Sequence, residues 1–334
     1  MQSSGVRALG AAFDPWSLLL AALTIGVFAY GAVVVPHFFS AFNLAQLAAG
    51  VAEKALLVLP MVLLITAREI DLSVASVLAL TSVALGLLLQ AGVPLLLTLP
   101  LVIALGALLG AFNGALVAFV GLPSLVVTLG TMAMYRGIGY IFLGAGSINT
   151  FPASLTDFGV DDIPGTRIPL VVVPFLLLAP LFAMLLQGMP FGRRVYVIGG
   201  NPDVALYSGI GVKRARFQLF VISGAVCAIA GIVYTARLAN ARANNALGME
   251  LDVITMALLG GVSVWGGKGK LTGVFWALAL IAMLRNILGI SQIGGDAQGL
   301  VIGLLLIGSL LASNFSGFLA AWLRNIGAPV RASG

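Results

Sequence analysis

The sequence is poor in charged residues and in side chains that carry chemistry. Only 8% of its 334 residues are charged, and it has a single histidine and a single cysteine. One cysteine excludes an intramolecular disulfide, and Cys227 lies in an apolar stretch, where it fits a small packing residue better than a reactive thiol. His37 lies in an expected outer loop and fits an interfacial residue. We therefore expect no metal site and no catalytic residues, so the chain should not be an enzyme.

What the sequence does have is apolar length. Hydrophobic residues make up 60% of the chain and its mean hydropathy is +1.13, which leaves too little polar surface to cover a soluble globule. Several apolar runs reach about 20 residues, the length that crosses a bilayer core. The first run, Trp16 to Val35, has nothing obviously cleavable after it and is expected to be a retained helix. The sequence therefore predicts an integral membrane protein.

The apolar runs predict an all-α polytopic fold with about ten transmembrane helices. Their expected ranges are 16 to 35, 45 to 67, 72 to 91, 94 to 119, 124 to 144, 168 to 187, 216 to 237, 251 to 265, 271 to 290 and 297 to 313. The eighth range is short and rich in glycine, and it either spans the membrane or re-enters it partway. Acidic tripeptides at 69 to 71 and 250 to 252 each open an apolar segment, which agrees with an inverted repeat of five plus five helices.

Lysine and arginine fall mainly on one side of this helix order. With a cytoplasmic N-terminus, the inner side receives Arg7, Arg68, Arg193, Arg194, Lys213, Arg214, Arg216, Lys268, Lys270, Arg324 and Arg331. Both termini are then inside. We expect one membrane domain, residues 1–334, with cytoplasmic segments at 1–14, 188–215 and 314–334. The cations are not gathered into a stripe with interleaved aromatics, so the net charge of +6 indicates contact with membrane lipid and not with nucleic acid.

A knot of charge interrupts the apolar sequence at REIDLSVAS, residues 68 to 76. Near the inner interface Arg68 is expected to pair with Glu69, and Asp71 or Ser73 is expected to cap the following helix. The knot is either a structural helix break or a break that lines a solute pathway. Few other ionisable groups lie within the spans, and Glu53 is expected to pair with the adjacent lysine at 54, which argues against a proton-coupled pump.

Two further segments combine glycine or proline with apolar residues, at 120 to 131 and 258 to 270. Non-helical backbone at membrane depth survives only where protein or a water-filled cavity satisfies its polar groups, so both are candidates for a pathway. The alternative for each glycine is close helix packing.

The longest inner loop, residues 189 to 217, predicts a short helix at 202 to 208. Asn201 can cap it, Pro202 suits its first position, Asp203 complements its positive end, and Gly209 ends it. Its apolar surface predicts either a docking site for a peripheral protein or a helix resting on the inner leaflet. That surface is formed by Val204, Ala205, Leu206 and Tyr207.

Four motifs, in order, resemble those of bacterial ABC-importer permeases of the ribose type, which serve sugars and sugar-like signals. They are EIDLSVAS, AFNGALVAFVGLPSLVVTLGTMAMYRG, GRRVYVIGGNPDVALYSGIGV and ITMALLGGVSVWGGKGKLTG, and the resemblance runs from about 44 to 313. TDFGVDDIPGTRIPL and VALYS are most similar to the autoinducer-2 branch and its rhamnose-importer neighbours. The family commonly has Gly-Gly where this chain has Arg68 and Glu69, which puts close backbone packing at that turn in doubt.

The resemblance implies a permease subunit of the bacterial inner membrane that works by ATP-driven alternating access. Its partners would be ABC ATPase subunits, a second permease, identical or not, and a periplasmic solute-binding protein. The sequence has no phosphate-binding loop, since GGKGK at 266 to 270 lacks the required spacing, so ATP and Mg are expected on the ATPase. The alternative function is a self-sufficient secondary transporter or channel for a small polar solute.

The resemblance also implies two sets of site residues. The helix at 202 to 208 would be the coupling helix that docks on the ATPase, with its contact formed by Asn201, Pro202, Asp203, Val204, Ala205, Tyr207, Ser208 and Gly209. The candidates for the translocation pathway are Asp71, Ser73, Asn113, Ser124, Thr128, Tyr135, Gly260 and Gly261.

Overall fold

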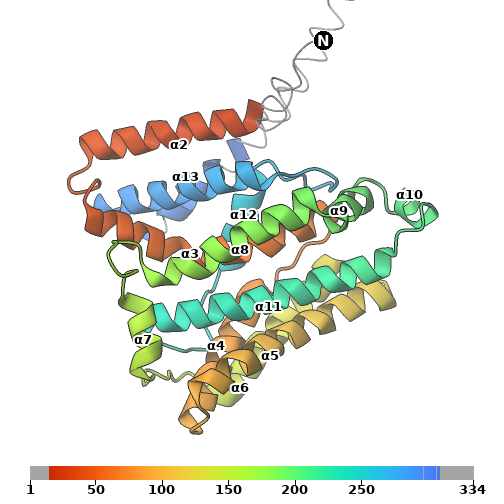
Figure 1. Cartoon of the computed structure of the whole chain (residues 1–334), viewed down its shortest axis with the longest axis horizontal. Helices are drawn as coiled ribbons and strands as arrows, with labels where there is room; N and C mark the ends of the chain where they lie inside the picture. Colours follow the sequence, from red (N-terminus) through yellow and green to blue (C-terminus); the bar gives the residue numbers. More distant parts are fainter. Residues whose placement is uncertain (1–14, 296, 306, 309–334) are drawn as a thin grey trace, which may run out of the picture.

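The protein is a bundle of helices, seen in a computed structural model that describes residues 15–295, 297–305, 307 and 308 (Figure 1). Within these residues there is no β-strand. The elements are α2 (Pro15–Val34), α3 (Ala41–Thr66), α4 (Val74–Gln90), α5 (Leu95–Ala115), η1 (Leu116–Val120), α6 (Ser124–Leu143), α7 (Ala153–Val160), η2 (Leu170–Val172), α8 (Val173–Ala183), η3 (Met184–Gly188), α9 (Pro190–Gly200), α10 (Pro202–Tyr207), α11 (Val212–Leu238), α12 (Met249–Leu259) and α13 (Leu271–Ile290).

Seven segments of the described chain are long and apolar enough to cross a membrane, which confirms the polytopic all-α fold. They are Pro15–Val34, Ala41–Thr66, Leu95–Val120, Ser124–Leu143, Leu170–Gly188, Val212–Leu238 and Leu271–Ile290. The expected helix at 72 to 91 is the shorter apolar helix α4. These eight elements match eight of the ten expected ranges.

Of the remaining two ranges, the structure decides between the alternatives for the eighth and describes only part of the tenth. The eighth helix, expected at 251 to 265, is α12, whose 11 residues extend only about 16 Å and cannot cross the bilayer. The tenth is helical at 297–305, 307 and 308, and its expected end at 309 to 313 lies outside the described residues. The predicted tails at 1–14 and 314–334 also lie outside them.

The core of the bundle is formed by α3, α4 and α11. Most residues of these three helices are buried, whereas α2, α5 and α6 leave most of their apolar side chains on the outside. An apolar exterior is what lipid requires. Figure 1 shows α11 running between α3 and α5.

Glycines allow α5 and α11 to touch along their backbones. A Cβ atom on Gly106 would collide with the carbonyl oxygen of Gly224, and one on Gly110 would collide with that of Phe220. Small residues at such spacing are the usual means by which membrane helices approach closely. At these positions glycine has a packing role.

One helix within the expected inner loop was not predicted. Residues 190 to 200 form α9, which begins with a proline at its first turn. Its buried positions repeat every three or four residues, as in any helix packed on one face. They are Gly192, Val195, Ile198 and Gly199. The short helix expected at 202 to 208 is α10, and Figure 1 shows it at the opposite end of the bundle from α7.

Candidate functional site

The chain breaks between α3 and α4 at Arg68, which has a φ of 66°. This left-handed conformation is one that glycine adopts freely and other residues adopt at a cost of about 1–2 kcal/mol. The Arg68 side chain gains partners there: its Nε donates to the carbonyl oxygen of Trp265 at 2.5 Å, and its Nη2 donates to that of Gly200 at 3.0 Å. The arginine therefore ties the break to the end of α9 and to the loop after α12.

The expected pair between Arg68 and Glu69 is wrong. Glu69 pairs instead with Arg216 at the start of α11, with 2.7 Å between Nε and Oε1. Neighbouring side chains at a turn point in different directions, so each of the two charges finds a distant partner. The side chains of Arg68 and Glu69 thus connect the break to three elements: α9, the loop after α12, and α11.

Asp71 lies at the centre of a buried network of polar groups. Its Oδ1 accepts from the Ser73 backbone N–H at 2.9 Å and from the Ser73 hydroxyl at 2.6 Å, and its Oδ2 accepts from Ser223 of α11 at 3.0 Å. The Ser73 hydroxyl also accepts from Asn113 at 2.8 Å, and the amide oxygen of Asn113 accepts from Tyr135 at 3.1 Å. Asp71 thus holds Ser73, the residue before α4, and the Ser73 side chain makes no capping bond to the helix, so the expected side-chain cap by Ser73 is not formed.

Two residues of α6 hold the backbone of the same break. The Ser124 hydroxyl accepts from the N–H of Ile70 at 3.2 Å, and the Thr128 hydroxyl donates to the carbonyl oxygen of Ile70 at 3.2 Å. We call the six residues Asp71, Ser73, Asn113, Ser124, Thr128 and Tyr135 the Asp71 cluster; all six are buried. The structure therefore brings together six of the eight predicted pathway residues.

The other two predicted pathway residues have apolar neighbours. A Cβ atom on Gly260 would collide with Val274 of α13, and one on Gly261, whose φ is 87°, would meet Trp16 of α2. Both glycines therefore let the end of α12 pack tightly against these two helices. The structure does not bring them into the Asp71 cluster.

The predicted coupling segment has the expected cap. The Asn201 side chain accepts from the N–H groups of Asp203 at 2.9 Å and Val204 at 3.2 Å, and Gly209 has a φ of 76° just after the helix. Ala205 is buried against a small apolar cluster formed by Ile198, Val212 and Ala215. The remaining apolar side chains of α10 are exposed, Tyr207 at 90% and Leu206 at 62%.

Helix α9 connects α10 to the break. A Cβ atom on Gly199 would collide with the carbonyl oxygen of Thr66, which also accepts from the N–H of Gly267 at 2.9 Å. The Tyr196 hydroxyl donates to the carbonyl oxygen of Gly269 at 2.6 Å. Burial raises the pKa of Tyr196 above its usual value, so this donor keeps its proton. α9 is thus fixed to the end of α3 and to the loop after α12.

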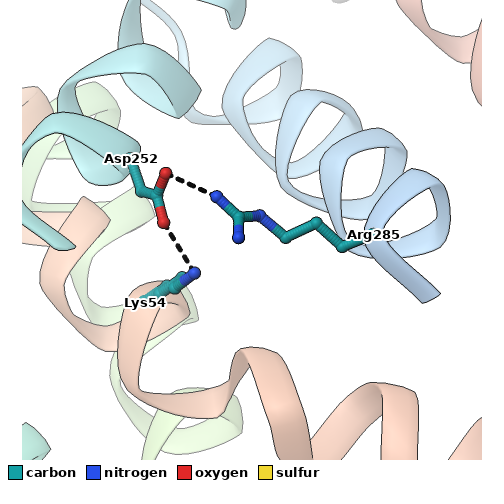
Figure 2. Close-up of polar contacts among 3 residues, drawn as sticks. All are labelled: Lys54, Asp252 and Arg285. Carbon is teal, nitrogen blue, oxygen red and sulfur yellow. Dashed lines mark hydrogen bonds and ion pairs between the residues drawn. The ribbon is translucent and has the colours of Figure 1, made fainter. Parts of the chain in front are cut away.

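A second group of charges lies in the middle of the bundle. Asp252 in the first turn of α12 accepts from Lys54 of α3 and from Arg285 of α13, each at 2.7 Å (Figure 2). Glu53 pairs with Arg237 of α11 at 2.7 Å. The expected pair between residues 53 and 54 is therefore wrong, because adjacent residues of a helix do not face each other.

The irregular segment between α11 and α12 is also held by a charge. Arg136 of α6 donates to the carbonyl oxygens of Ala243 at 2.8 Å and Asn245 at 3.0 Å. Both acceptors belong to buried residues of this segment. Such satisfaction is what non-helical backbone needs at membrane depth.

The apolar exterior, the buried polar break and the supported irregular segment are the features of a multi-pass membrane transport protein. A family model described as "Branched-chain amino acid transport system / permease component" matches residues 43–310. The chain belongs to this family and is a multi-pass permease of the inner membrane.

Two relatives are similar over most of their length. The ribose import permease protein of Haemophilus influenzae is 30% identical over 85% of this chain and 89% of its own. The autoinducer 2 import system permease protein of Escherichia coli O9:H4 is 33% identical over 87% of this chain and 90% of its own. No solved structure matches the chain.

Proposed function

We propose that this chain is the transmembrane permease subunit of an ABC importer and forms the path for a sugar or sugar-like solute. Its relatives are import permeases for ribose and for autoinducer 2, and their names support this class of solute. The driving force would come from ATP through alternating access of the helix bundle. ATP and Mg would be held by separate ATPase subunits and not by this chain.

The observation that carries the proposal is the surface of α10. Its Tyr207 and Leu206 side chains point away from the protein, while Ala205 seats the helix on a small apolar cluster and Asn201 caps it. Exposed apolar side chains on a well-anchored helix mark contact with a protein or with the membrane, and the similarity to import permeases favours a protein. We assign that partner as the ATPase.

Helix α9 would carry the movement of α10 inward. It contacts the carbonyl oxygen of Thr66 and, through Arg68, the break between α3 and α4. The break leads directly to Asp71. A shift of α10 would therefore reach the Asp71 cluster, whose hydroxyl and amide groups would exchange their mutual hydrogen bonds for bonds to solute hydroxyls.

Two more partners complete the proposed assembly. A second permease, identical or not, would face this one across the path. A periplasmic solute-binding protein would deliver the solute and supply most of the selectivity. Import then follows from delivery on one side and ATP hydrolysis on the other.

The test compares Tyr207→Asp with Tyr207→Phe in the reconstituted importer. A carboxylate at a dry contact should lower ATP-dependent uptake at least about ten-fold, whereas Phe keeps the apolar area and should retain uptake. Membrane insertion should be equal in both. Normal uptake by Tyr207→Asp, or solute flux through the isolated chain in liposomes, would contradict the proposal.

A further inference from the structure

Two cations and one carboxylate meet where α3, α12 and α13 come together. Figure 2 shows the Lys54 ammonium and the Arg285 guanidinium approaching opposite oxygens of Asp252. The sum of their charges is one positive charge. The positive end of the α12 dipole adds to it, because Asp252 lies in the first turn of that helix.

This charge lies deep in the bilayer. Lys54 is near the middle of α3 (Ala41–Thr66), about 18–20 Å from either end of the helix. Headgroups lie about 15 Å or more from the midplane, so a lipid phosphate is poorly placed to neutralise the charge. Ionisable groups at such depth mark solute or ion pathways by default.

A cavity of about 220 Å³ adjoins the three residues. Among the described residues that line it, the charged ones are Lys54 and Arg285, and both are paired with Asp252. Gln46 and Asn286 add amide groups, and the rest of the wall is apolar. The volume is below the roughly 300–1,000 Å³ of sites for drug-sized ligands, which suits a small solute.

The cavity wall has more donors than acceptors. Lys54 has three N–H bonds and directs one to Asp252, and Arg285 directs an Nη2–H bond to the other oxygen of the same carboxylate. Asn286 is engaged with Asn43 through two reciprocal bonds of 2.9 Å. The groups of the wall that can still bind a solute are therefore cationic hydrogen-bond donors.

We propose that this cavity is a solute subsite that recognises an anionic oxygen group, with Lys54 and Arg285 as its ligands and Asp252 as the carboxylate that pairs with them when no solute is bound. The inference rests on the proposed transport of a sugar-like solute, and it narrows that class to solutes bearing a carboxylate. Arginine and lysine bind such groups through charge-assisted hydrogen bonds.

The experiment uses the purified full chain in nanodiscs of neutral lipid and measures binding by titration calorimetry. The probes are ribose and ribonate, which share a carbon skeleton and differ in the carboxylate. Ribonate should bind about ten-fold or more tightly than ribose. Lys54→Gln and Arg285→Gln should each weaken ribonate binding by about ten-fold and leave ribose binding unchanged.

Asp252→Asn provides the sharpest arm, because it frees both cations and should tighten ribonate binding. A triad with a purely structural role predicts the same sign for all three variants. Arg242→Gln, at an exposed arginine outside the cavity, removes the same charge and should change nothing. Lys54→Arg keeps the charge and should retain binding, which guards against a folding defect in the glutamine variant.

Three results would overturn the proposal. They are equal affinity for the two probes, weaker binding in Asp252→Asn, and loss of ribonate binding when phosphatidylglycerol is added to the nanodiscs, which would assign the site to a lipid headgroup. Binding is measured without the ATPase, so a failure of ATP-driven uptake would contradict the importer proposal and leave the solute subsite supported. Loss of binding would equally leave the importer proposal intact.

Discussion

Two acidic residues at the starts of short helices have opposite surroundings. Asp71, before α4, accepts hydrogen bonds from the hydroxyls of Ser73 and Ser223 within one buried cluster, and Asn113 donates in turn to Ser73. Asp252, in the first turn of α12, is bonded to two cations beside a cavity. Neutral donors can exchange with solute hydroxyls at small cost, whereas ion pairs in a low dielectric are costly to break. The Asp71 region is therefore suited to opening, and the Asp252 region to fixing position and charge.

The largest expected effect tests the ion pairs in the middle of the bundle, which include Glu53 with Arg237 beside the Asp252 region. Glu53→Ala would leave Arg237 facing the bundle without its carboxylate, and should destabilise the protein by about 3–5 kcal/mol. The measurement is the denaturation midpoint of the purified chain. Replacing both partners, with Glu53→Leu and Arg237→Met together, should recover most of the loss. If the single variant is as stable as the parent, the ion pair does not anchor this region.

An intermediate effect is expected in the Asp71 cluster. Asp71→Ala leaves the Ser73 N–H, the Ser73 hydroxyl and the Ser223 hydroxyl without their acceptor, and should cost about 2–3 kcal/mol. Asp71→Asn keeps an acceptor oxygen and should cost less. Both are compared in the same denaturation assay and in uptake. Equal losses in the two variants would show that the charge of Asp71, and not its bonding, matters.

The smallest effect on stability is expected at Arg68, where coupling should change instead. Arg68→Gly relieves the left-handed backbone but removes two hydrogen bonds, so stability should stay within about 1 kcal/mol of the parent. Uptake per ATP hydrolysed should fall about five-fold or more, because α9 loses its tie to the break. Arg193→Ala removes an exposed arginine of α9 and should not change the ratio. An unchanged ratio in Arg68→Gly would show that the movement takes another route.

The sequence was sufficient for the apolar spans and for local motifs. Span lengths follow from apolar runs, and the Asn201 cap is a contact between near neighbours, so both could be read directly. The pairing of Glu53 and of Arg68 could not, because their partners lie far away in the chain and depend on how the helices pack.

The missed residues show the same limit. Arg216, Ser223 and Asp252 lie far along the chain from the charged residues that they contact, and no short spacing relates them. Helix α9 did carry one local signal, a proline at its first position, which suits the start of a helix. The family resemblance named the six residues of the Asp71 cluster as candidates for a solute pathway, which stays a prediction, and the structure shows that they lie together.

The glycine contact between α5 and α11 has a mechanical consequence. Where Gly106, Gly110 and Gly224 bring two backbones into direct contact, no side chains remain between them to slide or rotate. The two helices must then shift together as a single strut. In the proposed alternating access, the movement would then be made by elements packed against these two helices, such as the turn before α4, which is bonded to α11 through Asp71 and Ser223.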